Sequence, residues 1–174
     1  MSSEHELLSG LKVLDLTHYV AGPYATRLMA AQGAEVIKVK RPGTGDPARH
    51  MGPFPDDIPH PEKSALFLYL NTTKKGVTLN LKTETGRRVF RQLVEQTDVL
   101  VENFSRRVMP ALGLDYETLS AINSGLVMTS ISNFGQTGRY RDYEAREINL
   151  YALGGLMQIT GEADREPLPG ARLA

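Results

Sequence analysis

The sequence predicts an α/β protein built on a Rossmann-like parallel sheet that is flanked by helices. Short, continuous apolar runs alternate with longer segments in which apolar residues recur at helical spacing, and few hairpin turns connect them. Continuous apolar runs are typical of strands that helices cover on both faces. With 174 residues, of which 41% are hydrophobic, the chain is long enough to bury a core of this kind.

The N-terminal part has the pattern of a β-α-β unit, which is a nucleotide-binding scaffold. Strands are expected over 11–16 and 34–39. Between them lie a tight loop at 17–23 and a helix at 24–32, which Gly33 should end. The loop then follows the first strand directly, at the edge of the sheet where ligands bind.

The second strand runs into a basic pair, Lys40 and Arg41. Nicotinamide-dependent enzymes place an acidic residue at this point to bind a ribose diol, whereas a basic side chain suits a phosphate on the ribose. The first loop also lacks the sequence G-x-G-x-x-G of dinucleotide sites. We therefore expect a phosphorylated adenosine carrier as the ligand, with an NADP-binding oxidoreductase domain as an alternative.

The rest of the chain continues the alternation of strands and helices. Prolines and glycines crowd the stretch 42–63, which should therefore be an irregular loop. Beyond it, the apolar pattern predicts a helix or strand at 64–70, strands at 77–81, 98–102 and 126–132, and helices at 83–96, 108–112, 116–122 and 144–159. The strand at 126–132 should be buried, and Gly154 and Gly155 should allow the last helix to pack closely.

Composition argues against several classes of protein. The formal net charge is zero, which does not suit a nucleic-acid-binding surface, and no apolar run approaches the ~20 residues of a membrane span. The chain has no cysteine, so disulfides, thiolate metal sites and a cysteine nucleophile are excluded. The histidines and aspartates show no metal-ligand spacing. A polar N-terminus unlike a signal peptide fits a cytoplasmic protein with no nucleic-acid or membrane partner.

Ligands of parallel α/β sheets bind outside the carboxyl ends of the strands. The loops expected at this edge are 17–22, 41–49, 103–107 and 132–138. Asp15 lies just inside this edge within a buried run, where an unpaired carboxylate is costly, so we expect it to have a structural partner. Asp46 and Arg49 are expected to pair with each other and order the second loop.

Five motifs stand in series along the chain. They read LKVLDLTHYVAGPYATRLMAAQGAEVIKVKRPGTGD, VTLNLKTETG, DVLVENF with LGLDYETL, SISNFGQTG, and INLYALGGLMQITGEADREPLPG. In this order, over nearly all of Leu8 to Gly170, they resemble the family III CoA-transferases, the group of formyl-CoA transferase, the carnitine CoA-transferases and α-methylacyl-CoA racemase. The resemblance implies that residues 8–174 are the N-terminal part of a CoA-binding large domain. The second domain of the interlocked homodimer that the family forms would lie outside this chain.

The resemblance also implies which residues meet CoA. Backbone positions after the first strand, a basic residue near the adenosine phosphate, a stretch around the adenine and 3′-phosphate, and loops near the thioester all have counterparts here. These residues are His18, Val20, Ala21, Arg41, Leu79, Lys82, Asn103, Phe104 and Gly135. Members of the family act on an acyl-CoA and a carboxylic acid and need no prosthetic group or metal.

Three positions depart from the pattern of the family. Ala111 stands where some members have a basic CoA contact, for which Arg106 or Arg107 could substitute. Ser132 replaces a lysine found in formyl-CoA transferase, and Arg146 replaces a histidine found in racemases. A racemase needs that second base, so the resemblance favours CoA transfer over racemisation.

No catalytic residue is expected within the chain. The nucleophilic aspartate of the family would fall just past Ala174. The last residues become more apolar after a loop, a pattern expected at the start of another strand or helix. We therefore expect a fragment that is inactive alone. The longer protein would transfer CoA through an anhydride and a thioester on that aspartate, and a CoA-binding module without activity is the alternative.

Overall fold

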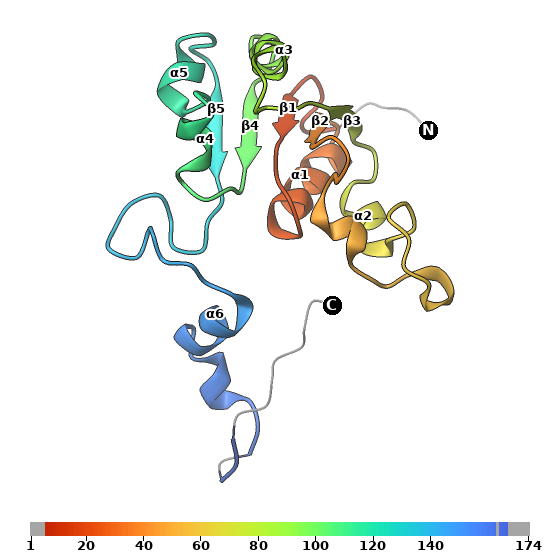
Figure 1. The fold of residues 1–174 in the computed structure, drawn as a ribbon, viewed down its shortest axis with the longest axis vertical. Helices are drawn as coiled ribbons and strands as arrows, with labels where there is room; N and C mark the ends of the chain where they lie inside the picture. The colour runs from red at the N-terminus through yellow and green to blue at the C-terminus, as the bar shows by residue number, and fades with distance from the viewer. Residues whose placement is uncertain (1–5, 163, 167–174) are drawn as a thin grey trace. The chain divides into compact units, whose positions relative to one another are not determined.

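A computed structural model describes residues 6–162 and 164–166 of the chain. They divide into two compact units, the first ending at Ser132 and the second beginning at Asn133. Only the first unit carries strands among the described residues (Figure 1). No helix in the described part of the chain is both long and apolar enough to cross a membrane.

The first unit is organised around a five-stranded sheet with the order β3-β2-β1-β4-β5. All neighbouring strands are parallel. The strands are β1 (Lys12–Asp15), β2 (Glu35–Lys40), β3 (Lys75–Thr78), β4 (Val99–Glu102) and β5 (Val127–Ser130). From β1, the next two strands, β2 and β3, are added on one side, and β4 and β5 are then added on the other side of β1. This reversal places a ligand-binding crevice outside the carboxyl ends of β1 and β4.

Helices cover both faces of the sheet, as the sequence predicts. They are α1 (Ala21–Ala31), α2 (Ala65–Leu70), α3 (Glu84–Val94), α4 (Val108–Ala111) and α5 (Tyr116–Ser120), with short 3-10 turns η1 (Pro47–His50) and η2 (Pro55–Asp57) in the proline-rich loop. Alternate residues of β1 pack on opposite faces of the sheet, because successive side chains of a strand point in opposite directions. Val13 packs on the side of α1, whereas Leu14 belongs to the larger core on the side of α3, α4 and α5.

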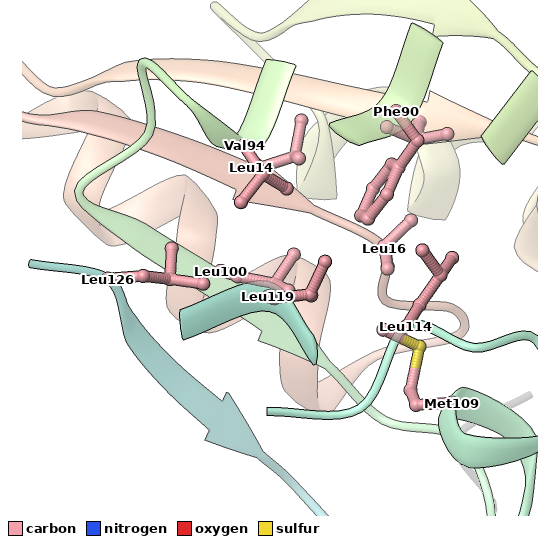
Figure 2. Close-up of a cluster of buried hydrophobic side chains, with 10 residues drawn as sticks. Leu14, Leu16, Phe90, Val94, Leu100, Met109, Leu114, Leu119 and Leu126 are labelled. Atoms are coloured by element: carbon pink, nitrogen blue, oxygen red, sulfur yellow. The ribbon is translucent and has the colours of Figure 1, made fainter. Parts of the chain in front are cut away.

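The larger core consists of side chains that are almost fully excluded from water (Figure 2). Figure 2 shows the ring of Phe90 next to Leu16 and Val94 next to Leu14, and none of the four is more than 2% exposed. Each such side chain contributes about 1.5–3 kcal/mol on burial. This core lies directly beneath the loops at the carboxyl edge and gives them a rigid base.

Several boundaries differ from those predicted. α1 begins at Ala21 rather than at residue 24, because Pro23 fits the first turn of a helix, where its missing N–H is not needed. The run at 64–70 is helical, as α2. The third strand ends at Thr78, so the apolar residues of 79–81 belong to the following loop. The fifth strand is not buried: Val127 is 58% exposed, because β5 pairs only with β4 in the described sheet.

The second unit contains a shorter helix than predicted. α6 spans Glu147–Leu153 and is followed by the 3-10 turn η3 (Leu156–Ile159). Gly155 adopts a left-handed backbone conformation, with a φ of 77°, which ends the helix. The glycine pair therefore interrupts the helix expected at 144–159.

Candidate functional site

A pocket of about 400 Å³ opens at the carboxyl ends of β1 to β4. Its walls come from the loop after each of these strands and from α4. Seven of its lining residues are apolar: Leu16, Val39, Leu79, Leu81, Phe104, Val108 and Leu112. This is the edge of the sheet, beside the reversal of strand order, at which ligands are expected.

Three basic residues line the same pocket. Lys40 ends β2, Arg41 directly follows it, and Lys82 follows β3. No lining residue is acidic, and Arg41 and Lys82 are exposed to solvent. The side-chain oxygen of Asn80 accepts the backbone N–H of Lys82 at 3.1 Å, which fixes the turn that carries this lysine. The pocket therefore combines an apolar floor with a cationic rim, a pattern that suits an anionic ligand with a flat apolar part.

His18 and Phe104 form one wall of the pocket. Their ring centroids lie 5.3 Å apart in an edge-on arrangement. Burial lowers the pKa of His18; Asp46 opposes this shift, and Lys38 and Arg41 add to it. The imidazole is therefore neutral near pH 7 and offers one hydrogen-bond donor and one acceptor.

Asn103 lies behind this wall and does not line the pocket. Its amide accepts the backbone N–H of His18 and donates to the backbone carbonyl of His18, each at 2.8 Å. The two bonds join the loops that follow β1 and β4. Asn103 thus holds the wall in place through the backbone of His18.

A cluster of buried charges lies beside the first loop. Asp15 is fully buried and contacts the Nζ atoms of Lys74 at 2.9 Å and Lys38 at 3.8 Å. Burial alone would raise the pKa of Asp15, but the two lysines and the hydroxyl groups of Thr17 and Thr26 bring it below its ordinary value. The expectation that Asp15 has structural partners is confirmed.

Lys74 anchors this cluster to α1. Its Nζ donates to Asp15, to the carbonyl of Pro23, to Thr26 and to Asn71, at 2.8–3.1 Å. Burial lowers the pKa of Lys74 to about 8, although the attraction of Asp15 opposes the shift. The lysine is therefore still mostly protonated at pH 7, and both its ion pair with Asp15 and its hydrogen bonds tie it to the fold.

Asp46 and Arg49 do not pair with each other, which corrects the prediction. Asp46 faces inward and contacts Lys38 at 3.0 Å, whereas Arg49 turns toward Glu62 at 2.6 Å and stacks on the ring of Phe67. Asp46 is almost fully buried, so its carboxylate needs a buried cation, and Lys38 is the one within reach.

Sequence reasoning missed Glu102, which is only 3% exposed at the end of β4. Its Oε2 accepts the backbone N–H of Phe104 at 2.7 Å. Burial raises the pKa of Glu102, and hydrogen bonds from Ser130 and Phe104 oppose that shift. The sequence did offer one signal for Glu102: it ends a buried apolar strand and directly precedes Asn103, a predicted site residue. Lys38 and Lys74 were missed as well, because a lysine is assumed to be solvated.

The structure brings part of the predicted site together. The predicted residues that line the pocket are His18, Arg41, Leu79, Lys82 and Phe104. Val20 precedes α1 and Ala21 begins it, and neither lines the pocket. Gly135 belongs to the second unit, which is described by itself. In the residues that the structure describes, no group of histidine, aspartate and glutamate side chains could hold a metal ion.

Comparison with known proteins identifies a family for this chain. Residues 8–171 match the sequence model described as CoA-transferase family III. The chain is 42% identical over 158 residues to the acetyl-CoA:oxalate CoA-transferase of Acetobacter aceti, covering 91% of this chain and 39% of that protein. It is 40% identical over 163 residues to the succinate–glutarate CoA-transferase of Agrobacterium fabrum, covering 92% of this chain and 41% of that protein.

The fold is also found in a solved structure. A CaiB/BaiF family protein from Brucella suis superimposes with a TM-score of 0.85 and 38% sequence identity. The match covers 97% of this chain and 44% of the other. The α/β fold predicted from the sequence is therefore confirmed, and the chain spans about two fifths of the length of the curated relatives above.

Proposed function

Because the chain belongs to CoA-transferase family III, we propose that it supplies the CoA-binding part of an enzyme that moves CoA between an acyl-CoA and a carboxylic acid. The relatives from Acetobacter aceti and Agrobacterium fabrum are both named as CoA-transferases. The observation that carries the proposal is the pocket at the carboxyl edge of the sheet. Its cationic rim adjoins an apolar floor, and CoA likewise joins phosphates to a flat adenine and an uncharged arm.

We propose a direction for CoA in this pocket. The 3′-phosphate and the adenine would lie at Arg41, Leu79 and Lys82, because guanidinium and ammonium groups bind phosphate and aliphatic side chains pack on a flat base. The pantetheine arm would pass toward His18 and Phe104. Val20, Ala21, Asn103 and Gly135 remain proposed members of the site, with Asn103 acting through His18.

The proposed chemistry is covalent catalysis by a carboxylate. The carboxylate attacks the carbonyl carbon of the acyl-CoA, the C–S bond breaks, and CoA leaves as a thiolate while a mixed anhydride forms. The thiolate then attacks the carbonyl of the enzyme carboxyl group, which releases the first acid and leaves an enzyme thioester. The second acid attacks this thioester, which releases the thiolate and forms a second mixed anhydride. The thiolate then attacks the carbonyl carbon of the second acid in this anhydride, which forms the new acyl-CoA and frees the enzyme carboxylate.

We infer that the nucleophilic carboxylate comes from outside the 174 residues, so the chain alone should be inactive. The test is incubation with acetyl-CoA and oxalate, the pair in the name of one relative, followed by hydroxylamine, which traps acylated carboxylates. The expected result is no transfer above background. Transfer together with an enzyme-linked hydroxamate would show that a carboxylate within the chain is the nucleophile.

Binding by calorimetry separates the proposal from an NADP-binding domain, which Arg41 directly after β2 also suits. We expect CoA to bind and NADP to bind more weakly, because the first loop has no glycine-rich turn for a dinucleotide diphosphate. Tighter binding of NADP would favour the oxidoreductase alternative. Binding of CoA without activity in any longer form of the protein would favour an inactive CoA-binding module.

We also propose that the protein assembles as a homodimer. Large apolar side chains of the second unit face solvent, among them Ile148 at 65%, Leu153 at 73% and Ile159 at 79% exposure. Exposed apolar surface of this kind usually meets a partner. Light scattering tests assembly directly, and a monodisperse monomer that binds no hydrophobic dye would contradict it.

A further inference from the structure

Lys38 is an unusual residue for the centre of a sheet. It lies in β2 with a side-chain exposure of 3%, between apolar neighbours. Its Nζ donates to the carbonyl of Thr17 at 2.7 Å and contacts Asp46 at 3.0 Å. A buried cation costs several kcal/mol unless it is paired and hydrogen-bonded, and here these partners belong to two different loops of the pocket edge.

The partners of Lys38 hold the backbone on both sides of His18. Thr17 comes directly before His18, and its carbonyl is bound by Lys38 itself. Tyr19 comes directly after, and its N–H donates to Oδ1 of Asp46 at 3.2 Å. The same Oδ1 accepts the N–H of Ala48 at 3.0 Å, which fixes the second loop.

Tyr19 itself has a strained backbone. Its φ is 64°, in the left-handed region that side-chain-bearing residues rarely adopt. Its side chain is 54% exposed, so packing of the ring does not force this conformation. The hydrogen bond from Tyr19 to Asp46 does constrain the backbone at this point, and strain of this kind persists only where the surroundings impose it.

We propose that the Lys38–Asp46 pair is a positioning bridge that holds the backbone on both sides of His18, through the carbonyl of Thr17 and the N–H of Tyr19, and thereby sets His18 against Phe104 for CoA. The bridge rests on the proposed function, because it deepens the role of the same pocket. Lys38 does not touch the ligand; it acts through the backbone of the first loop. Asp15 also faces Lys38, at 3.8 Å, but its shorter contact is with Lys74, at 2.9 Å.

The bridge is testable because Asp15 keeps its contact with Lys74 when Lys38 is replaced. Lys38→Met alone would leave Asp46 buried without a cation and should destabilise the fold. Lys38→Met combined with Asp46→Asn removes both charges, keeps a side-chain oxygen for Tyr19 and Ala48, and leaves the Asp15–Lys74 pair intact. We expect the double variant to unfold within a few degrees of wild type.

Calorimetry with CoA then tests positioning. The double variant should bind CoA about tenfold more weakly, because the tie between Lys38 and Thr17 is lost. Lys38→Arg, which keeps the cation, should recover part of the affinity. Lys75→Met serves as the control, since Lys75 is an exposed lysine on β3 that pairs only with Glu35 among the contacts of the described residues, and it should bind as wild type.

A measurement on the wild-type chain guards against variants that fail to fold. The NMR signals of the His18 ring and the Tyr19 amide should shift when CoA is added. If wild type binds no CoA, the proposed function itself fails. If wild type binds CoA but these signals stay fixed, or if the folded double variant binds CoA as tightly as wild type, the bridge is only structural and the inference is wrong.

Discussion

The amide of Asn103 binds both backbone polar groups of His18, although 85 residues separate them in sequence. The two 2.8 Å bonds need one donor and one acceptor on the same side chain, which an amide has and an ionised carboxylate lacks. They cross between β1 and β4, where the strand order reverses. The wall of the pocket is therefore set by a contact between the two halves of the sheet.

Asn103→Ala should weaken CoA binding as well as the fold. Loss of the two bonds frees His18 and leaves its partly buried N–H and carbonyl without their partner, at a cost of about 1–3 kcal/mol. Asn123 is a matched control, because its amide also binds backbone groups, the carbonyls of Val94 and Thr97. Asn123→Ala should lower stability without changing CoA affinity, as measured by thermal unfolding and calorimetry. Equal losses of affinity in both variants would refute a specific role of Asn103.

Lys74→Met should destabilise the fold strongly. The change removes the 2.9 Å partner of the fully buried Asp15, and breaking a buried pair of this kind costs about 3–5 kcal/mol. Lys75→Met, at the neighbouring residue, removes an exposed ion pair and should have little effect. Denaturant unfolding of the two variants measures the difference. Similar stabilities would mean that Asp15 is satisfied without Lys74.

Glu102 should make stability depend on pH. Burial raises the pKa of Glu102 in the folded state, so its contribution is fully present below the ordinary pKa and is lost as the pH rises through the raised value. Glu102→Gln stays neutral and can still accept the N–H of Phe104. The variant should therefore gain stability relative to wild type over the range of pH above the ordinary pKa of a glutamate.

Denaturant unfolding across this range measures the effect, with Glu117→Gln as an exposed control on α5. The control should follow the wild-type profile. A Glu102→Gln profile that runs parallel to wild type would mean that the carboxyl group of Glu102 titrates normally.

Gly86→Ala tests the packing of α3 against the loop that carries Lys82. A Cβ at Gly86 would lie 2.0 Å from the backbone oxygen of Asn80, so the loop must move. We expect a loss of about 1–3 kcal/mol and weaker CoA binding, although alanine favours helix over glycine by about 1 kcal/mol. Gly125→Ala, whose Cβ would make only ordinary contact at 3.5 Å, is the control. An unchanged thermal midpoint for Gly86→Ala would contradict this account.

Local patterns were sufficient to predict the α/β class, the parallel strands and the covering helices, because apolar periodicity records which faces are buried. They failed where a signal is ambiguous. Pro23 suggested a loop but fits the first turn of α1, and the apolar run around Val127 suggested burial although β5 has one neighbour in the described sheet. Local sequence does not say where a strand stands in a sheet.

The site was predicted less completely than the fold, for a related reason. Arg41 and Lys82 could be placed at the pocket because strand ends share one edge of a parallel sheet. The contact of Lys74 with Asp15 spans 59 residues, and no local pattern marks it. The sequence around Lys38 resembles that of any strand with a solvated lysine. Only the fold shows that its Nζ contacts the carbonyl of Thr17 and the carboxylate of Asp46.

The central claim is that the basic rim of the pocket binds the 3′-phosphate of CoA. Arg41→Ala should therefore weaken the binding of CoA more than that of dephospho-CoA, which lacks this phosphate. Arg88→Ala, at an exposed position of α3 outside the pocket, is the control and should bind both ligands as wild type. Calorimetry with the two ligands gives the direct answer: a selective loss for CoA supports the account, and equal weakening of both ligands contradicts it.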